Sequence, residues 1–167
     1  SIVAMAFFSS NILFWLETGY FEAASQTKPF LHTWSLAVEE QFYLFWPIIV
    51  LVAYKMGGRK RLFQVIALIT IASFAFSLYL TEVSPIWAFY SLPTRAWELG
   101  VGALLLFIPK RIRFSSNYGW IALALILYGT FAFTDKTPFP GTAALVPVLG
   151  TAFAIASFSN WPKAMNR

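Results

Sequence analysis

Long apolar segments separated by short polar loops restrict the fold of this chain more than any other feature. A helix needs about 20 apolar residues, with a range near 17–25, to cross a lipid bilayer. Six segments approach this length, and the fourth is short enough that residues 87–90 could extend its buried part. We expect membrane helices at residues 2–15, 36–54, 62–80, 93–108, 118–133 and 142–158.

The composition favours the same fold class. The chain is 59% hydrophobic and only 11% charged, whereas soluble domains carry about 25% charged residues. A water-soluble fold of this size could not bury so much apolar surface. The sequence therefore predicts an all-α, polytopic transmembrane helix bundle. With no cysteine and a single histidine, His32, neither a disulfide nor a metal site is expected.

The charged residues separate into two sets that alternate along the chain. One set contains nine of the twelve basic residues, in residues 55–61, 110–113 and 163–167, and no acidic residue. The other set contains all seven acidic residues. Because cytoplasmic loops of membrane proteins are enriched in lysine and arginine, residues 55–61 and 110–113 are predicted to be cytoplasmic. Residues 32–40 and 95–98 then lie on the outer side. The net charge of +5 therefore indicates membrane topology and not nucleic-acid binding.

A first cluster of polar residues lies where the long outer loop enters the second predicted helix. Carboxylates in a first helical turn are favoured by the helix dipole, so Glu39 and Glu40 could simply cap the helix. Alternatively, they lie at membrane depth, where ionisable groups face the protein interior or a wet cavity. Spacing of three and four residues places Ser35, Glu39 and Phe42 on one stripe. The candidate site residues of this cluster are His32, Trp34, Ser35, Glu39, Gln41 and Tyr43.

A second cluster begins the fourth predicted helix. Pro93 suits the first helical turn, and Arg95 and Glu98 are three residues apart, so they could pair with each other. Arg95 could equally reach Glu39 or Glu40. Gly100 and Gly102 provide a smooth face for close helix packing.

Two other interpretations are less consistent with the residues. A Ser35–His32–Glu39 triad lacks the Gly-x-Ser-x-Gly turn that presents a serine nucleophile, and His32 is only three residues from Ser35. Most of the tryptophan and tyrosine residues near the outer side are expected to form an interfacial belt, with one or two free to stack on a sugar ring.

Two sequence blocks resemble acyltransferase family 3, the bacterial membrane proteins of the O-antigen and peptidoglycan O-acetylase type. The first block comprises residues 10–15, 19–21 and 31–43, and the second is the Arg-x-x-Glu stretch in residues 93–100. The resemblance covers essentially the whole chain. It implies a roughly ten-helix protein, of which residues 1–167 would be an internal part of the transmembrane acyltransferase domain, truncated at both ends.

The resemblance also implies an activity. An acetyl or other short acyl group would pass from cytoplasmic acyl-CoA to a hydroxyl of a cell-surface polysaccharide or lipid-linked precursor, in the bacterial cytoplasmic membrane. No bound cofactor is expected, since acyl-CoA is a substrate. Glu39 would be catalytic, orienting a histidine in a family helix absent from this chain. Ser35, Gln41, Tyr43, Arg95 and Glu98 would line the site. The family's arginine-rich cytoplasmic loop is also absent, so this portion alone is predicted to be inactive.

Two other classes of function stay open at this point. The intramembrane charges would also suit a transporter or flippase of a lipid-linked sugar. However, the sequence has no matching pair of Gly/Pro-interrupted helices, which often mark secondary transporters. A non-catalytic membrane scaffold is the third possible class. An assay with labelled acyl-CoA would distinguish the three, since an enzyme would transfer the label to polysaccharide and a transporter would move the sugar without acylating it.

Overall fold

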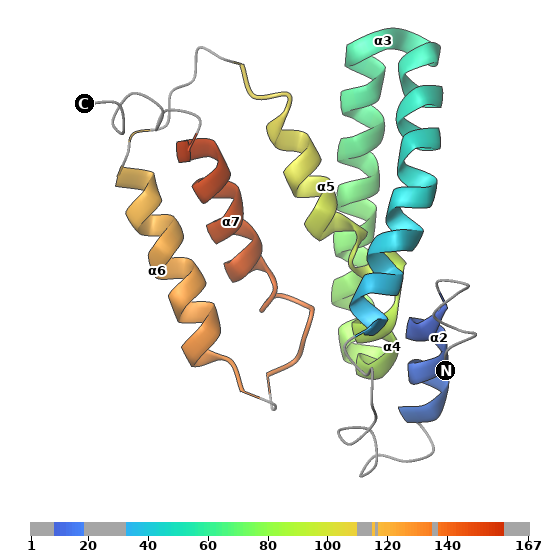
Figure 1. The fold of residues 1–167 in the computed structure, drawn as a ribbon, viewed down its shortest axis with the longest axis vertical. Coiled ribbons are helices and arrows are strands. Elements are labelled where there is room, and N and C mark those ends of the chain that lie inside the picture. Colours follow the sequence, from blue (N-terminus) through green and yellow to red (C-terminus); the bar gives the residue numbers. More distant parts are fainter. Residues whose placement is uncertain (1–8, 19–32, 110–114, 116, 135–136, 159–167) are drawn as a thin grey trace.

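The computed structural model describes residues 9–18, 33–109, 115, 117–134 and 137–158, and every element in this part of the chain is helical (Figure 1). The all-α prediction is therefore confirmed for these residues. The elements are α2 (Ser10–Thr18), α3 (Thr33–Val83), α4 (Pro85–Tyr90), the 3-10 helix η1 (Leu92–Thr94), α5 (Ala96–Leu105), α6 (Asn117–Ala132) and α7 (Leu145–Phe158).

Helix α3 is a hairpin of two antiparallel arms, residues 33–56 and 59–83 (Figure 1). The arms join at Gly57 and Gly58, whose backbone is not helical. Gly58 has φ 63°, in the left-handed region that glycine adopts without a Cβ penalty. The two arms correspond to the predicted membrane helices 36–54 and 62–80. Since a helix rises about 1.5 Å per residue, each arm is long enough to cross a hydrocarbon core of about 30 Å.

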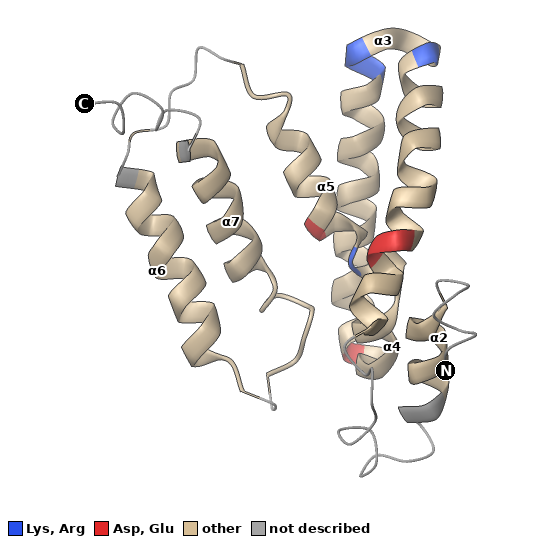
Figure 2. Ribbon diagram, viewed as in Figure 1, with Lys and Arg blue, Asp and Glu red and all other residues tan. Residues whose placement is uncertain are grey.

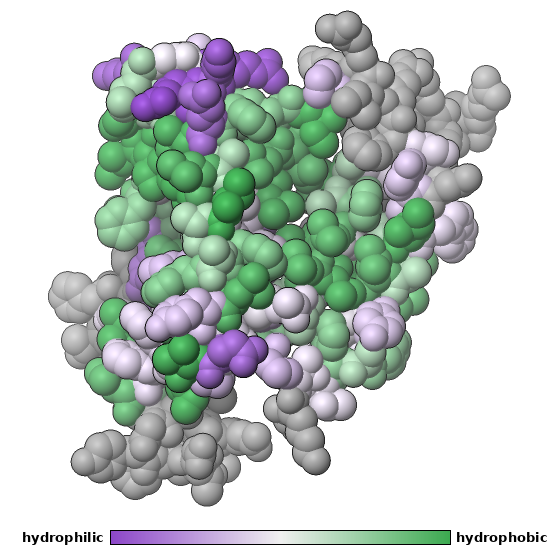
Figure 3. Space-filling view, turned by 180° about the vertical axis from the view of Figure 1, so that it is seen from behind, coloured by the Kyte–Doolittle hydropathy of each residue, from purple (hydrophilic) through white to green (hydrophobic). Residues whose placement is uncertain are grey.

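Charge is distributed unevenly along the bundle axis. Figure 2 shows basic residues at the α3 turn, whereas the acidic residues lie from about the middle of the bundle to the end near α4, with one further basic residue among them. Apolar side chains cover the middle of the surface in Figure 3. Large apolar side chains on several helices are strongly exposed, including Leu68 (68%), Leu106 (78%) and Phe131 (81%). Such a surface suits lipid better than water.

By length and composition, α3 is the one described helix that meets the requirement for a membrane span, with a mean hydropathy of 2.0 in its most apolar window. The helices Ala96–Leu105, Tyr118–Ala132 and Leu145–Ser157 are apolar but shorter. The predicted number of six spans therefore stays a prediction. Of the first predicted segment, residues 2–8 lie outside the described part, and α2 begins at Ser10 and ends at Thr18.

The fourth predicted segment is broken into pieces. Residues 87–90 belong to the separate helix α4, and Pro93 lies in η1 and not in the first turn of α5. The buried hydroxyl of Thr94 donates to the Ala88 carbonyl at 2.6 Å. From the second arm of α3, the Ser73 hydroxyl donates to the Pro93 carbonyl at 2.7 Å and accepts from the Trp97 backbone N–H at 2.9 Å. Side chains therefore replace the helical hydrogen bonds that the break removes.

The two glycines of α5 differ in their surroundings. A Cβ on Gly100 would collide with the side chain of Thr70 on α3, whereas a Cβ on Gly102 would meet nothing within 4 Å. The predicted close packing is therefore found at Gly100, where α5 lies against the second arm of α3, and Gly102 borders open space.

We predict opposite effects for alanine at these two positions. Gly100→Ala should destabilise the protein by about 1–3 kcal/mol through overpacking against Thr70. Gly102→Ala should be neutral or stabilise it by up to about 1 kcal/mol, because alanine favours the helix. Thermal unfolding of both variants in the same detergent measures the difference, and equal unfolding temperatures would contradict the packing described for Gly100.

Candidate functional site

A buried asparagine joins three helices where the first sequence block folds together. Asn11 on α2 is 3% exposed. Its Nδ2 donates to the carbonyl of Tyr90 at the end of α4 (3.0 Å), and its Oδ1 accepts from Gln41 Nε2 on α3 (2.9 Å). Beside it, the Ser10 hydroxyl donates to the Thr33 carbonyl at 3.0 Å. Gln41, predicted as a site residue, therefore fixes the first arm of α3 to α2 and α4.

The guanidinium of Arg95 lies among aromatic rings from three parts of the chain. Its Cζ is 4.8 Å from the ring centroid of Trp34 on α3, 5.1 Å from that of Phe89 on α4 and 5.4 Å from that of Phe139 in the segment before α7. The Trp34 ring also packs on Phe89 with centroids 4.6 Å apart. Trp34 and Arg95, taken from the two separate sequence blocks, are therefore in direct contact.

The contact differs in kind from the expected ion pair. Among the described residues, Arg95 forms no salt bridge with Glu39, Glu40 or Glu98, and its buried Nε atom has no hydrogen-bond partner. Arg95 immediately precedes α5 and faces the rings of Trp34 and Phe89. Cation–π attraction to the ring faces, worth about 2 kcal/mol when desolvated, takes the place of a carboxylate.

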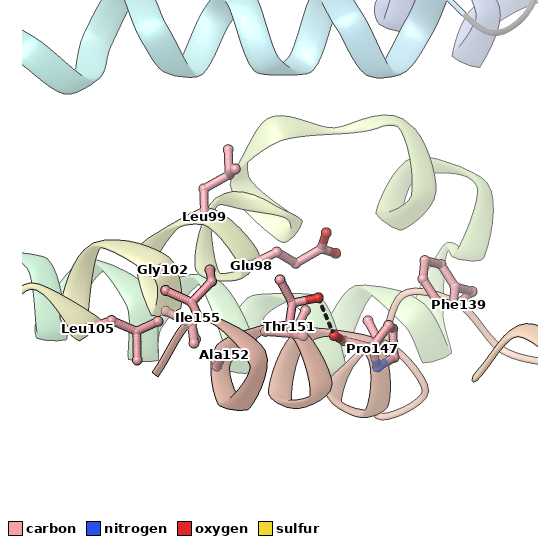
Figure 4. A pocket seen from close by; sticks show the side chains of 12 residues that line it. Glu98, Leu99, Gly102, Leu105, Phe139, Pro147, Thr151, Ala152 and Ile155 are labelled. Carbon is pink, nitrogen blue, oxygen red and sulfur yellow. Dashed lines mark hydrogen bonds between the residues drawn. The ribbon is translucent and has the colours of Figure 1, made fainter. Parts of the chain in front are cut away.

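Glu98 lines an apolar slot between α5 and α7. The slot has a volume of about 240 Å³. Its walls are formed by Glu98, Leu99, Val101, Gly102 and Leu105 on α5, by Phe139, and by Ala144, Pro147, Val148, Thr151, Ala152 and Ile155 on and before α7. Figure 4 shows the Glu98 side chain between Phe139 at one end and Leu105 at the other. Within the described part of the chain, the Oε1 atom of Glu98 is buried and accepts no hydrogen bond.

The first arm of α3 carries the remaining predicted site residues on two different faces. Ala37, Val38 and Phe42 are buried, and Phe42 stacks on Trp46 with centroids 4.6 Å apart. Glu39 and Tyr43 are exposed. The predicted stripe of Ser35, Glu39 and Phe42 is therefore divided, with Phe42 turned inward and Glu39 outward.

Not every predicted site residue joins one cluster. The structure brings Trp34 and Arg95 together and places Glu98 beside the slot. Ser35 and Glu40 are half-buried, and Gln41 contacts Asn11. His32 lies outside the described residues. No group of three metal-ligating side chains occurs in the described part.

Sequence reasoning missed four residues that shape this region: Asn11, Ser73, Phe89 and Phe139. Asn11 and Ser73 are polar residues in otherwise apolar segments. Their position could have indicated contacts between helices, because a polar group in hydrocarbon needs a hydrogen-bond partner. Phe89 and Phe139 had no such signal, since phenylalanine is abundant throughout the chain and only the fold brings these two to Arg95.

Several curated bacterial proteins are similar to this chain. A Bacillus subtilis protein, whose name provisionally describes it as a peptidoglycan O-acetyltransferase, is 35% identical over 119 residues, 69% of this chain and 19% of that protein. An uncharacterized Haemophilus influenzae protein is 33% identical over 166 residues, 91% of this chain and 68% of that protein. The Listeria monocytogenes peptidoglycan O-acetyltransferase is 29% identical over 175 residues, 95% of this chain and 28% of that enzyme.

The chain spans from about a fifth to two thirds of the length of these three relatives. It matches no family model and no solved structure.

We predict that Arg95→Lys lowers the unfolding temperature. A lysine ammonium is a compact point charge and cannot stack its plane on several rings as guanidinium does, so a loss of about 1–2 kcal/mol is expected. Arg59→Lys is the matched control, because the exposed Arg59 lies over the single Phe107 ring at 5.6 Å. Thermal unfolding in detergent measures both, and an equally small effect in the two variants would argue against the aromatic environment of Arg95.

Proposed function

Because this chain belongs to acyltransferase family 3, the family of membrane-bound O-acyltransferases that its sequence resembles, we propose that it is part of a membrane-bound O-acyltransferase. The enzyme moves an acetyl or other short acyl group from cytoplasmic acyl-CoA to a hydroxyl of a cell-surface polysaccharide or its lipid-linked precursor. Two relatives carry names that refer to peptidoglycan O-acetylation, which supports a carbohydrate acceptor.

One observation carries this proposal: the two sequence blocks typical of the family meet in space. Trp34 of the first block contacts Arg95 of the second, and Gln41 is connected through Asn11 to the end of α4. Aromatic rings, a guanidinium and nearby carboxylates are groups that hold a sugar by stacking and hydrogen bonding. These contacts support a common site at the outer half of the bundle.

Glu39 is the proposed catalytic group of this chain. It is exposed, and it lies between the exposed residues Leu36 and Tyr43 on the same face of α3. A carboxylate at membrane depth faces protein or a wet cavity and not lipid. We therefore expect this face to line the reaction cavity, with Glu39 orienting a histidine, supplied by a part of the protein outside this chain, that acts as general base on the acceptor hydroxyl.

The membrane location and orientation belong to the same proposal. The protein is a multi-pass protein of the bacterial cytoplasmic membrane, with residues 55–61 in the cytoplasm and residues 134–141 on the outer side. Acyl-CoA is then available at the face of the α3 turn, and the acceptor at the opposite face.

We predict that Glu39→Ala in the full-length protein lowers acyl transfer at least about 100-fold, because general base catalysis is typically worth about 10²–10⁴-fold. Glu39→Gln, which keeps the shape and removes the charge, should be similarly impaired. Mass spectrometry of O-acyl groups on the cell-surface polysaccharide measures this. Tyr79→Phe, an exposed position on the second arm of α3, is the control, and full acylation by Glu39→Ala would refute the role of Glu39.

We predict a defined labelling pattern for single cysteines, since this chain contains none of its own. In a background without other cysteines, Thr137→Cys should react with a membrane-impermeant maleimide in intact spheroplasts. Lys60→Cys should react only after the membrane is permeabilised. Reaction of both positions in intact spheroplasts would contradict the orientation.

A further inference from the structure

A partly polar cavity lies between the end of α3 and the segment that precedes α7. Its volume is about 250 Å³. It is lined by Leu78, Thr81, Glu82, Thr137, Pro138, Gly141, Thr142 and Ala143. The second arm of α3 ends at Val83, at the end of the bundle opposite the Gly57–Gly58 turn (Figure 1). In the proposed orientation, the cavity therefore lies at the outer face, where the acceptor is available.

Hydrogen bonds within the protein hold the walls of this cavity in place. The Gly141 N–H donates to Thr81 Oγ1 at 3.1 Å and so joins the segment before α7 to α3. The Thr81 hydroxyl in turn donates to the Ser77 carbonyl at 2.7 Å. Within the segment, the Thr134 N–H donates to Thr137 Oγ1 at 3.0 Å. Because these bonds exist without a ligand, binding needs little further ordering of the protein, which favours affinity.

Three polar side chains of the lining keep hydrogen-bonding capacity for a ligand. The exposed side chains of Glu82 and Thr142 form no hydrogen bond or ion pair with any residue in the described part of the chain. Thr137 Oγ1 accepts one hydrogen bond, and its O–H has no acceptor among the described residues. A carboxylate only accepts hydrogen bonds, whereas a hydroxyl both donates and accepts. The cavity therefore offers acceptors and donors together, and a sugar hydroxyl can use both.

The size of the cavity and its remaining walls favour a single sugar unit. Its volume of about 250 Å³ corresponds to about eight water molecules at ~30 Å³ each. This is below the range of about 300–1,000 Å³ that is usual for a whole drug-sized ligand, so one ring fits better than a longer molecule. Leu78, Pro138 and Ala143 supply apolar surface against which the C–H groups of a ring can pack.

The segment that lines the cavity also reaches the aromatic rings around Arg95. Phe139 directly follows Pro138 of the cavity wall. The centroid of its ring is 5.4 Å from Arg95 Cζ and 6.3 Å from the ring centroid of Phe89. The cavity and the proposed acylation site therefore share one segment of the chain, which connects them.

We propose, on the basis of the proposed function and its orientation, that this cavity binds one neutral sugar unit of the acceptor, next to the unit that is acylated. Glu82 accepts hydrogen bonds from the sugar hydroxyls, and the hydroxyls of Thr137 and Thr142 bind the same ring from the segment before α7. The cavity thereby selects and positions the acceptor, and it takes no part in the acyl transfer itself.

Binding is measured by protection of single cysteines in the full-length protein, reconstituted in nanodiscs in a background without other cysteines. Pro138→Cys and Ala143→Cys place a thiol in the apolar wall and leave the three polar side chains intact. Thr134→Cys, an exposed position of the same segment outside the lining, is the matched control. The probe is the neutral oligosaccharide fraction released by mild hydrolysis from the cell-surface polysaccharide of the source bacterium. We expect it to slow maleimide labelling of both cavity cysteines and not of the control.

Two substitutions of Glu82 test how the sugar is recognised. Glu82→Leu should raise the oligosaccharide concentration for half-maximal protection at least about tenfold, the ratio that one hydrogen bond to a charged group accounts for. Glu82→Gln keeps an acceptor oxygen and should raise it less. Since Glu82 is exposed, neither variant should change the unfolding temperature. Glucosamine, a cationic sugar, tests the alternative that the carboxylate binds an ammonium group.

Equal labelling of the cavity cysteines with and without the oligosaccharides would overturn the binding site, and unchanged protection in Glu82→Leu would overturn the role of Glu82. Protection by glucosamine and not by the neutral fraction would overturn the recognition of sugar hydroxyls. The assay contains no acyl donor, so it separates the two proposals. A protein that acylates polysaccharide without protection of the cysteines contradicts the cavity alone, and one that shows protection without acylating contradicts the proposed enzyme.

Discussion

The break between α4 and α5 depends on hydrogen bonds from side chains in surroundings that offer little water. A backbone that leaves the helix exposes N–H and C=O groups, and each unsatisfied group in an apolar environment costs several kcal/mol. Here the hydroxyls of Ser73 and Thr94 satisfy the carbonyls of Pro93 and Ala88 and the N–H of Trp97. Because these bonds fix the chain immediately before and after Arg95, they determine which way its guanidinium faces.

Arg95 and Glu98 then act on different sides of the same short segment. Arg95 is held by Trp34, Phe89 and Phe139, so it connects the first arm of α3, α4 and the loop before α7. Glu98 lies toward α7 and lines the slot. The two charges influence each other without forming a salt bridge among the described residues. Arg95 therefore organises the framework, while Glu98 belongs to the wall of a cavity.

The helical class, the two arms of α3 and the clustering of basic residues at the α3 turn could be predicted from the sequence, because they follow from local hydropathy and from the cost of moving charge into lipid. The sequence was also sufficient to identify Trp34, Gln41, Arg95 and Glu98 as notable residues. It could not reveal their partners. The ion pair expected for Arg95 was a prediction from spacing along one helix, and the structure contains cation–π contacts instead, because Phe89 and Phe139 approach from other elements.

The pattern of apolar residues also could not predict that the α4–α5 region is divided into separate helices. By hydropathy, residues 87–108 form one nearly continuous apolar segment. The break is stabilised by hydrogen bonds of Ser73, which is distant in sequence, and of Thr94, which form only once the chain has turned. Likewise, Gly100 and Gly102 are equivalent in sequence, and only the approach of Thr70 distinguishes them.

The tight turn at Gly57 and Gly58 has a consequence for how the protein is made. With no loop between them, the two arms of α3 can enter the bilayer only together, as one helical hairpin. The basic residues Lys55, Arg59, Lys60 and Arg61 surround that turn, and they would resist translocation as a group. During synthesis, the turn therefore stays at the cytoplasmic surface in the proposed orientation, and it anchors the helices that are threaded after it.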